Sequence, residues 1–147
     1  MLMTENKCGS GATAEVFVDE LQIIKRFILE KKRERYSEFV VATKKREKFL
    51  RELYHFDDFD PDVIVRLPGK SETIEEILKE LRARGAKDDC YIISCDKELD
   101  RMTLPLVDAL QRVFARIEGT IISCGPTVAY YEGEAPNNRF ILNKRKV

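Results

Sequence analysis

The tetrapeptide Ile-Ile-Ser-Cys occurs twice in this chain, at residues 92–95 and 121–124. Each copy ends a short run rich in isoleucine, which is typical of a buried strand. The two copies are 29 residues apart, close to the length of about 30 residues that a strand, a crossover helix and a parallel strand need. A helical pattern runs from Pro105 to Ile117 between them, and Gly119 follows it. We therefore predict two parallel neighbouring strands that end at the same edge of a sheet.

The residues before this unit predict mainly helices. Apolar residues follow helical spacing from about residue 20 to 42 and again from 44 to 54. The segment Val-Ile-Val-Arg-Leu at 63–67 is a short strand candidate. An amphipathic helix is expected to begin after Ser71 and to end at Gly85.

The residues after this unit predict an antiparallel hairpin. Residues 128–132 and 139–142 are strand-like, and the turn-forming sequence Ala-Pro-Asn-Asn lies between them. The predicted fold class is therefore α/β, a single domain with a mixed sheet, a β-α-β crossover, a C-terminal antiparallel hairpin and a helical N-terminal third. Residues 1–15 are expected to form a flexible arm, and residues 16–147 the domain.

Composition limits the classes of partner. A chain of 147 residues with 44% hydrophobic and 35% charged content is typical of one globular domain. Basic and acidic residues both number 26, so the overall charge does not favour nucleic acid or an anionic membrane. No apolar run reaches the roughly 20 residues that span a bilayer, and we expect a cytoplasmic protein without membrane association. The cysteines are expected to be reduced.

Polar residues follow the two Ile-Ile-Ser-Cys strands. Ser94 and Asp96 leave the first strand, Asp100 and Arg101 follow in the next loop, and Ser123 leaves the second strand. Ligands of open α/β sheets bind beside such strand ends. We expect a small ligand, an anion in particular, to bind at this edge. The alternative is a hydrolase or nuclease that uses the acidic residues there.

Two further acidic stretches are candidate sites. Glu132 lies in Tyr-Tyr-Glu-Gly-Glu, and Arg139 follows across the predicted hairpin, so this carboxylate is a candidate for ligand binding or catalysis. His55 opens His-Phe-Asp-Asp-Phe-Asp-Pro-Asp, where the imidazole and one aspartate could bind a divalent metal or act as acid and base. The stretch lacks the glycine and the distal glutamate of a calcium-binding EF-hand loop. We therefore assign no metal site, and the cofactor stays unknown.

The predicted N-terminal helices are strongly basic. Between Lys25 and Arg51 there are 11 basic residues against 4 acidic ones, a local excess of seven. Lys44, Lys45 and Arg46 are therefore candidates for phosphate contacts in an alternative function, nucleic-acid binding. The glutamates between them and the acidic stretch that follows favour a solvated surface instead.

The N-terminal helices also carry apolar residues near the chain terminus. Because such a patch can be covered by a second copy of the chain, we expect a homodimer as one arrangement. The patch consists of Ile23, Ile24, Phe27 and Ile28.

Three stretches together resemble a family of small bacterial proteins to which no activity is assigned. They are Lys-Lys-Arg-Glu-Arg-Tyr-Ser-Glu-Phe at 31–39, Lys-Lys-Arg-Glu-Lys-Phe-Leu-Arg-Glu-Leu-Tyr-His-Phe at 44–56, and the ending from Thr120 to Glu134. The resemblance implies a compact single domain and supplies no catalytic residue.

Overall fold

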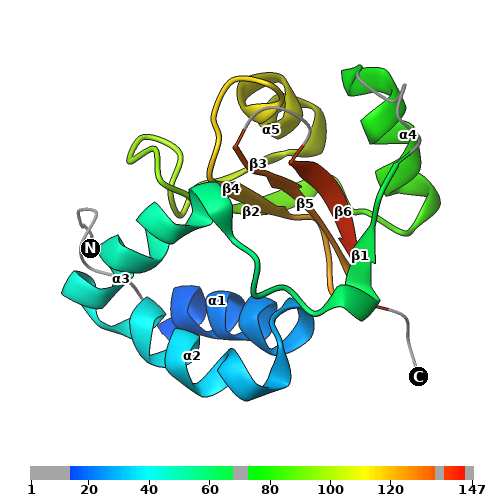
Figure 1. Cartoon of the computed structure of the whole chain (residues 1–147). Coiled ribbons are helices and arrows are strands. Elements are labelled where there is room, and N and C mark those ends of the chain that lie inside the picture. Colours follow the sequence, from blue (N-terminus) through cyan, green and yellow to red (C-terminus); the bar gives the residue numbers. More distant parts are fainter. Residues whose placement is uncertain (1–13, 68–72, 135–137, 145–147) are drawn as a thin grey trace.

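The computed structural model describes residues 14–67, 73–134 and 138–144 (Figure 1). A sheet with two interspersed helices follows an N-terminal helical third, so the predicted α/β fold class is confirmed. The helices are α1 (Ala14–Phe27), α2 (Arg33–Val41), α3 (Thr43–Glu52), α4 (Ile74–Ala83) and α5 (Leu106–Val113), and the strands are β1 (Ile64–Val65), β2 (Asp89–Ser94), β3 (Thr103–Pro105), β4 (Thr120–Ser123), β5 (Val128–Glu132) and β6 (Arg139–Asn143).

The strands form one sheet in the order β1-β6-β5-β4-β2-β3, and every neighbouring pair is antiparallel. The prediction that β2 and β4 are parallel is therefore wrong, and the sheet is not mixed. Tyr91 lies opposite Ser123, and Ser94 lies opposite Thr120.

The short strand β3 explains this difference. It pairs antiparallel with β2, so the chain has already reversed before α5 begins. Strands β3 and β4 consequently run in the same direction on either side of β2, and α5 connects them. A crossover helix between parallel strands does exist, but it starts from β3, and β2 lies between the two strands that it joins.

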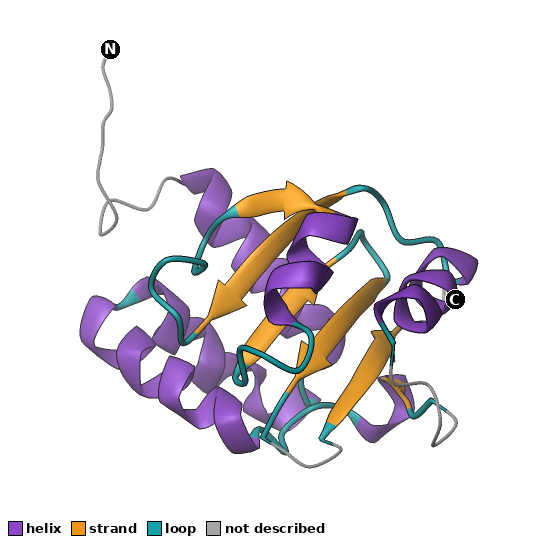
Figure 2. Cartoon of the chain, turned by 90° about the horizontal axis from the view of Figure 1, so that it is seen from above, coloured by secondary structure: helices purple, strands orange, loops and turns teal. Residues whose placement is uncertain are grey.

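Helices cover both faces of the sheet (Figure 1). Helices α4 and α5 cover one face, where Cys90 and Ile92 of β2 belong to their hydrophobic cluster. Helices α1, α2 and α3 cover the other face, where Ile93 is part of the second cluster. This alternation follows the two-residue period of a strand. Figure 2, seen from the side of α4 and α5, shows the strands passing beneath these two helices.

The N-terminal helical third differs from the prediction at its first helix. The expected helix over residues 20–42 is divided, because α1 ends at Phe27 and α2 begins after a short 3-10 turn. Ile28 forms an antiparallel bridge with Phe59. The backbone N–H of Asp60 donates to the carbonyl of Phe27 at 2.8 Å. Pairing with a distant segment thus replaces the helical hydrogen bonds that local spacing would favour.

The apolar patch expected to face a second copy of the chain is part of the core. Its side chains are at most 3% exposed and pack against the sheet. The observation that motivated a homodimer is therefore explained within one chain. These residues are Ile23, Ile24, Phe27 and Ile28.

The remaining predictions of strands and helices are mostly confirmed. β1 falls within the expected strand at 63–67, and β5 pairs with β6 as the expected hairpin. Ser71 lies outside the described residues, and Thr73 instead caps α4 by accepting the Glu76 N–H at 3.2 Å. The expected arm also lies outside them, except for its last two residues, which begin α1. None of the described helices is both long and apolar enough to cross a membrane.

Candidate functional site

The predicted edge residues Asp100 and Arg101 belong to a buried network of charged side chains. Arg46 of α3 forms an ion pair with Glu20 of α1, and its Nη2 lies 2.8 Å from Oδ1 of Asp100. Glu20 is fully buried, and Arg46 is 6% exposed. Arg101 Nε donates to Glu20 at 3.2 Å, and the Tyr91 hydroxyl donates to the same carboxylate. The network therefore joins two helices to the sheet.

The charges in this network are satisfied internally. Two guanidinium groups balance two carboxylates, and the backbone N–H of Ser94 donates to Asp100 at 3.0 Å. Burial raises the pKa of Asp100, while the Arg46 guanidinium acts in the opposite direction. Charges removed from water are tolerated only with such pairing. The network thus links α1 and α3 to the sheet, and its cations already contact internal carboxylates.

Of the other predicted edge residues, Ser94 and Asp96 lie beside Asp100, whereas Ser123 lies apart from them. The Ser94 hydroxyl lies 2.8 Å from that of Thr120 and accepts the Asp96 N–H at 3.0 Å. Ser123 lies opposite Tyr91, near the other end of β2, because the strands are antiparallel. The prediction that Ser94 and Ser123 end their strands at the same edge of the sheet is therefore wrong.

Glu132 is also buried, at 2% exposure. The Tyr130 hydroxyl donates to it, and Arg139 lies directly opposite on β6 with Nη2 at 3.1 Å from Oε2. The Arg139 guanidinium also stacks on the Phe114 ring, with 4.6 Å to the ring centroid. Glu132 and Arg139 therefore balance each other's charge inside the fold.

The three basic candidates of α3 differ in exposure. Lys44 and Lys45 are exposed, whereas Arg46 is buried in the charged network. Arg46 is therefore not part of a basic surface, and its replacement would affect the fold.

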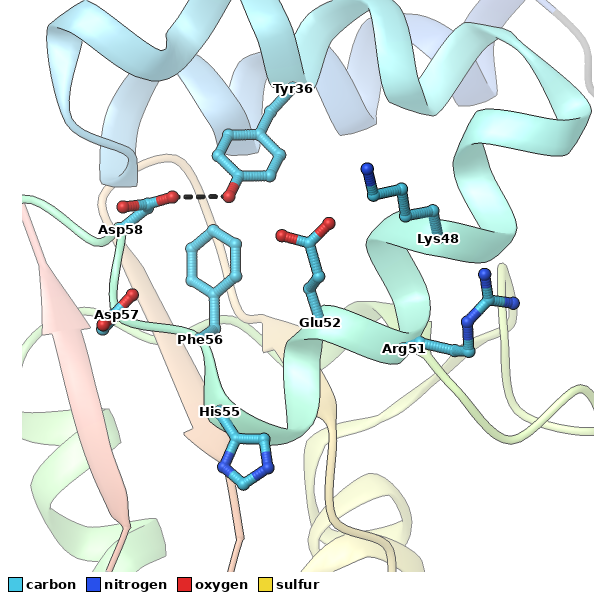
Figure 3. A pocket seen from close by; sticks show the side chains of 8 residues that line it. All are labelled: Tyr36, Lys48, Arg51, Glu52, His55, Phe56, Asp57 and Asp58. Carbon is cyan, nitrogen blue, oxygen red and sulfur yellow. Dashed lines mark hydrogen bonds between the residues drawn. The ribbon is translucent and has the colours of Figure 1, made fainter.

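A pocket of about 440 Å³ lies where the basic helices meet the acidic turn (Figure 3). In the sequence, the basic helices and the acidic stretch after His55 are separate candidate sites. Helices α2 and α3 form one wall, and the segment after α3 forms the other. The lining residues are Tyr36, Lys48, Arg51, Glu52, His55, Phe56, Asp57 and Asp58.

Glu52, the last residue of α3, is the unusual member of this pocket. Its Oε2 atom is shielded from solvent and has no hydrogen-bond partner within the described part of the chain. Figure 3 shows its carboxylate between Lys48 and the ring of Phe56, below Tyr36. A shielded polar atom without a partner costs about 1–3 kcal/mol, so such atoms are rare in folded proteins. No local pattern in the sequence distinguishes this glutamate from its exposed neighbours.

The far wall of the pocket is held by aromatic packing. The ring of Phe56 lies 5.2 Å from that of Tyr36 and 4.7 Å from that of Phe59, centroid to centroid. The backbone N–H of Phe56 donates to the Tyr131 hydroxyl at 3.2 Å, and that hydroxyl donates to the Leu53 carbonyl. These contacts attach the segment after α3 to β5 and give the pocket a fixed shape.

Two ionisable side chains are fixed at opposite sides of the pocket. The Tyr36 hydroxyl donates to Asp58 at 2.5 Å, and burial together with this bond raises the pKa of Tyr36. His55 Nδ1 lies 2.7 Å from Oε2 of Glu134, and both side chains are exposed. His55 is thus held at the rim by Glu134, two residues after β5.

The pocket does not assemble a metal centre. Within the described ranges, no group of three or more histidine, cysteine, aspartate or glutamate side chains is arranged to hold a metal ion.

Comparisons of the chain with family models, with curated proteins and with solved structures find no match.

Proposed function

We propose that this protein binds a small ligand that presents a positively charged hydrogen-bond donor, an amine or a guanidinium group, to Glu52. The observation that supports this proposal is the shielded Oε2 atom, which lacks a donor within the described structure. A ligand ammonium would supply a charge-assisted hydrogen bond, which is about twice as strong as a neutral one. Binding would thereby remove a cost that the ligand-free fold carries.

The other charges of the pocket favour a ligand with two ends of opposite charge. Asp57 and Asp58 lie on the side of the acidic turn, and Lys48 and Arg51 lie on α3. A zwitterion such as an amino acid would place its ammonium near Glu52 and its carboxylate near the two basic side chains. The volume of about 440 Å³ lies within the usual range of about 300–1,000 Å³ for ligand pockets.

The pocket is a better candidate than the predicted sheet edge. Asp100 and Arg101 already bind Arg46 and Glu20, so an anion at the edge would have to displace an internal partner. Within the described residues, the Oε2 atom of Glu52 has no such partner to displace. The ligand-binding function expected from the sequence is therefore retained, with a cationic donor as the central recognition element.

A thermal-shift screen tests the proposal. Simple amines, guanidinium compounds, amino acids and simple carboxylates are added to the wild-type protein and to Glu52→Gln. Amines should raise the melting temperature of the wild type through mass action and leave Glu52→Gln unchanged. Glu47→Gln, an exposed position on the same helix, is the matched control and should respond like the wild type. Stabilisation by carboxylates alone, or by amines in Glu52→Gln, would refute the proposal.

Nucleic-acid binding is the second candidate, favoured by the exposed cations of α3. Lys44, Lys45, Lys48 and Arg51 are all exposed within one ten-residue helix. The double variant Lys44→Glu with Lys45→Glu, which leaves Arg46 in place, should weaken binding of a short duplex. The slope of log affinity against log salt should fall by about two. An unchanged slope would exclude this surface.

A further inference from the structure

Cys90 of β2 and Cys124, the residue after β4, lie opposite each other. The register pairs Tyr91 with Ser123, so the next pair along the two chains is Cys90 with Cys124. Both side chains are fully buried, and both belong to the cluster under α4 and α5. The antiparallel arrangement, absent from the sequence-based prediction, is what brings these two cysteines together.

The hydrogen-bond pattern defines the geometry of this pair. The backbone N–H of Cys95 donates to the Gly119 carbonyl at 3.1 Å, which makes these two residues a hydrogen-bonded pair. Hydrogen-bonded and non-hydrogen-bonded pairs alternate along an antiparallel ladder. Cys90 and Cys124 are five pairs further along the ladder. Because five is an odd number, they form a pair of the other type, which is non-hydrogen-bonded. The Cα atoms of such pairs are about 4.5 Å apart, within the range of about 4.4–6.8 Å that disulfides span.

The folded environment of the pair opposes its oxidation, because both side chains are fully buried. A hydrogen bond with the Cys90 thiol, together with burial, raises the pKa of the Cys124 thiol. A protonated thiol is a poor nucleophile, so reaction needs the strand ends to open. Such an opening involves only a few residues at the strand ends, because the exposed Asp89 precedes Cys90 and the half-buried Gly125 follows Cys124.

We propose that Cys90 and Cys124 form a reversible disulfide that joins β2 to β4 when a peroxide oxidant is present. The two S–H groups give up two protons and two electrons, and one S–S bond forms. The O–O bond of hydrogen peroxide breaks. Its two oxygen atoms take up these protons and electrons and leave as two water molecules. A dithiol reductant reverses the reaction by thiol–disulfide exchange.

The third described cysteine is a natural control for this pair. The Cys95 thiol donates to the Glu118 carbonyl at 3.0 Å. It follows β2 directly, five residues after Cys90, and its N–H bond to Gly119 continues the ladder. Period-two alternation therefore points the two side chains to opposite faces. Cys95 is also partly exposed. Peroxide should therefore reach Cys95 first without linking it to Cys90.

The experiment uses the full chain carrying Cys8→Ser and Cys95→Ser, so that only the proposed pair remains. The protein is treated with hydrogen peroxide, natively and in urea below the unfolding transition, and the remaining thiols are alkylated before peptide mapping. Both thiols should disappear together into one Cys90–Cys124 crosslinked peptide, with unchanged circular dichroism and a higher melting temperature that dithiothreitol reverses. Cys124→Ala in the same background should form no intramolecular link. Two thiols that stay fully alkylatable in urea, or that oxidise separately without a crosslink, would overturn the proposal.

Discussion

Arg46 on α3 and Glu20 on α1 form a buried ion pair between residues 26 positions apart in the sequence. The same guanidinium binds Asp100 in the loop between β2 and β3. One side chain therefore connects two helices and the sheet. Removing it would leave two carboxylates without their main cationic partner in a site that excludes water.

Arg46→Met tests the contribution of this connection to stability. We expect the free energy of unfolding to fall by about 3 kcal/mol or more, because breaking a buried pair leaves uncompensated charge. Lys45→Met is the matched control, since Lys45 is exposed and lies 3.8 Å from Glu38, also exposed. Its effect should stay within about 0.5 kcal/mol. Urea unfolding of both variants measures the difference, and equal small losses would contradict a stabilising role for the network.

Arg101 offers a second test, because its backbone is in the left-handed region with φ 68°. This conformation costs a residue with a Cβ roughly 1–2 kcal/mol. Arg101→Ala removes the guanidinium and keeps this strain, whereas Arg101→Gly removes both. We expect both variants to be less stable than the wild type, and the glycine variant to be more stable than the alanine variant by up to about 1 kcal/mol. Equal stability of the two would indicate that the backbone relaxes.

The individual strands were predictable because their signals are local. Runs of isoleucine, alternation in the last segment and turn residues between them indicated β2, β4, β5 and β6. The relative direction of β2 and β4 was not predictable from the same signals. The deciding element is β3, a strand of three residues that ends in a proline, and nothing in such a segment shows that it pairs back onto β2.

The candidate sites illustrate the same limit. The sequence indicated Asp100 and Arg101, but their partners Glu20 and Arg46 are distant along the chain, and charged residues in helical segments ordinarily face solvent. The acidic turn and the end of the basic helix were each indicated alone. Their meeting at one pocket depends on the packing of Tyr36 against Phe56, which only the tertiary structure shows.

Alkaline pH should destabilise the protein through its buried tyrosines. Burial raises the pKa of Tyr131 to about 12 and raises the pKa values of Tyr36, Tyr91 and Tyr130 as well. The unfolded chain loses these protons near pH 10. The folded state then holds more protons than the unfolded state, so stability is complete below pH 10 and decreases as pH rises above it.

Each of these tyrosines contributes at most about 1.4 kcal/mol of lost stability per pH unit. For Tyr131 the loss continues to its folded pKa near 12. Urea unfolding at several values of pH, with tyrosinate absorbance as a second signal, measures the effect. Tyrosinate that appears near pH 10 in the folded protein would contradict it, because the pKa of the exposed Tyr54 is also raised, by a hydrogen bond with Cys95.

Glu52→Gln should separate stability from binding. The shielded Oε2 atom lacks a donor in the described structure, so removing its charge should raise the free energy of unfolding of the ligand-free protein, by about 1 kcal/mol. The same variant should lose the stabilisation by amines, since a neutral amide cannot form an ion pair with an ammonium group. Functional sites often carry this kind of cost. Urea unfolding with and without a saturating amine measures both effects, and a variant less stable than the wild type would show that the carboxylate is already paired in solution.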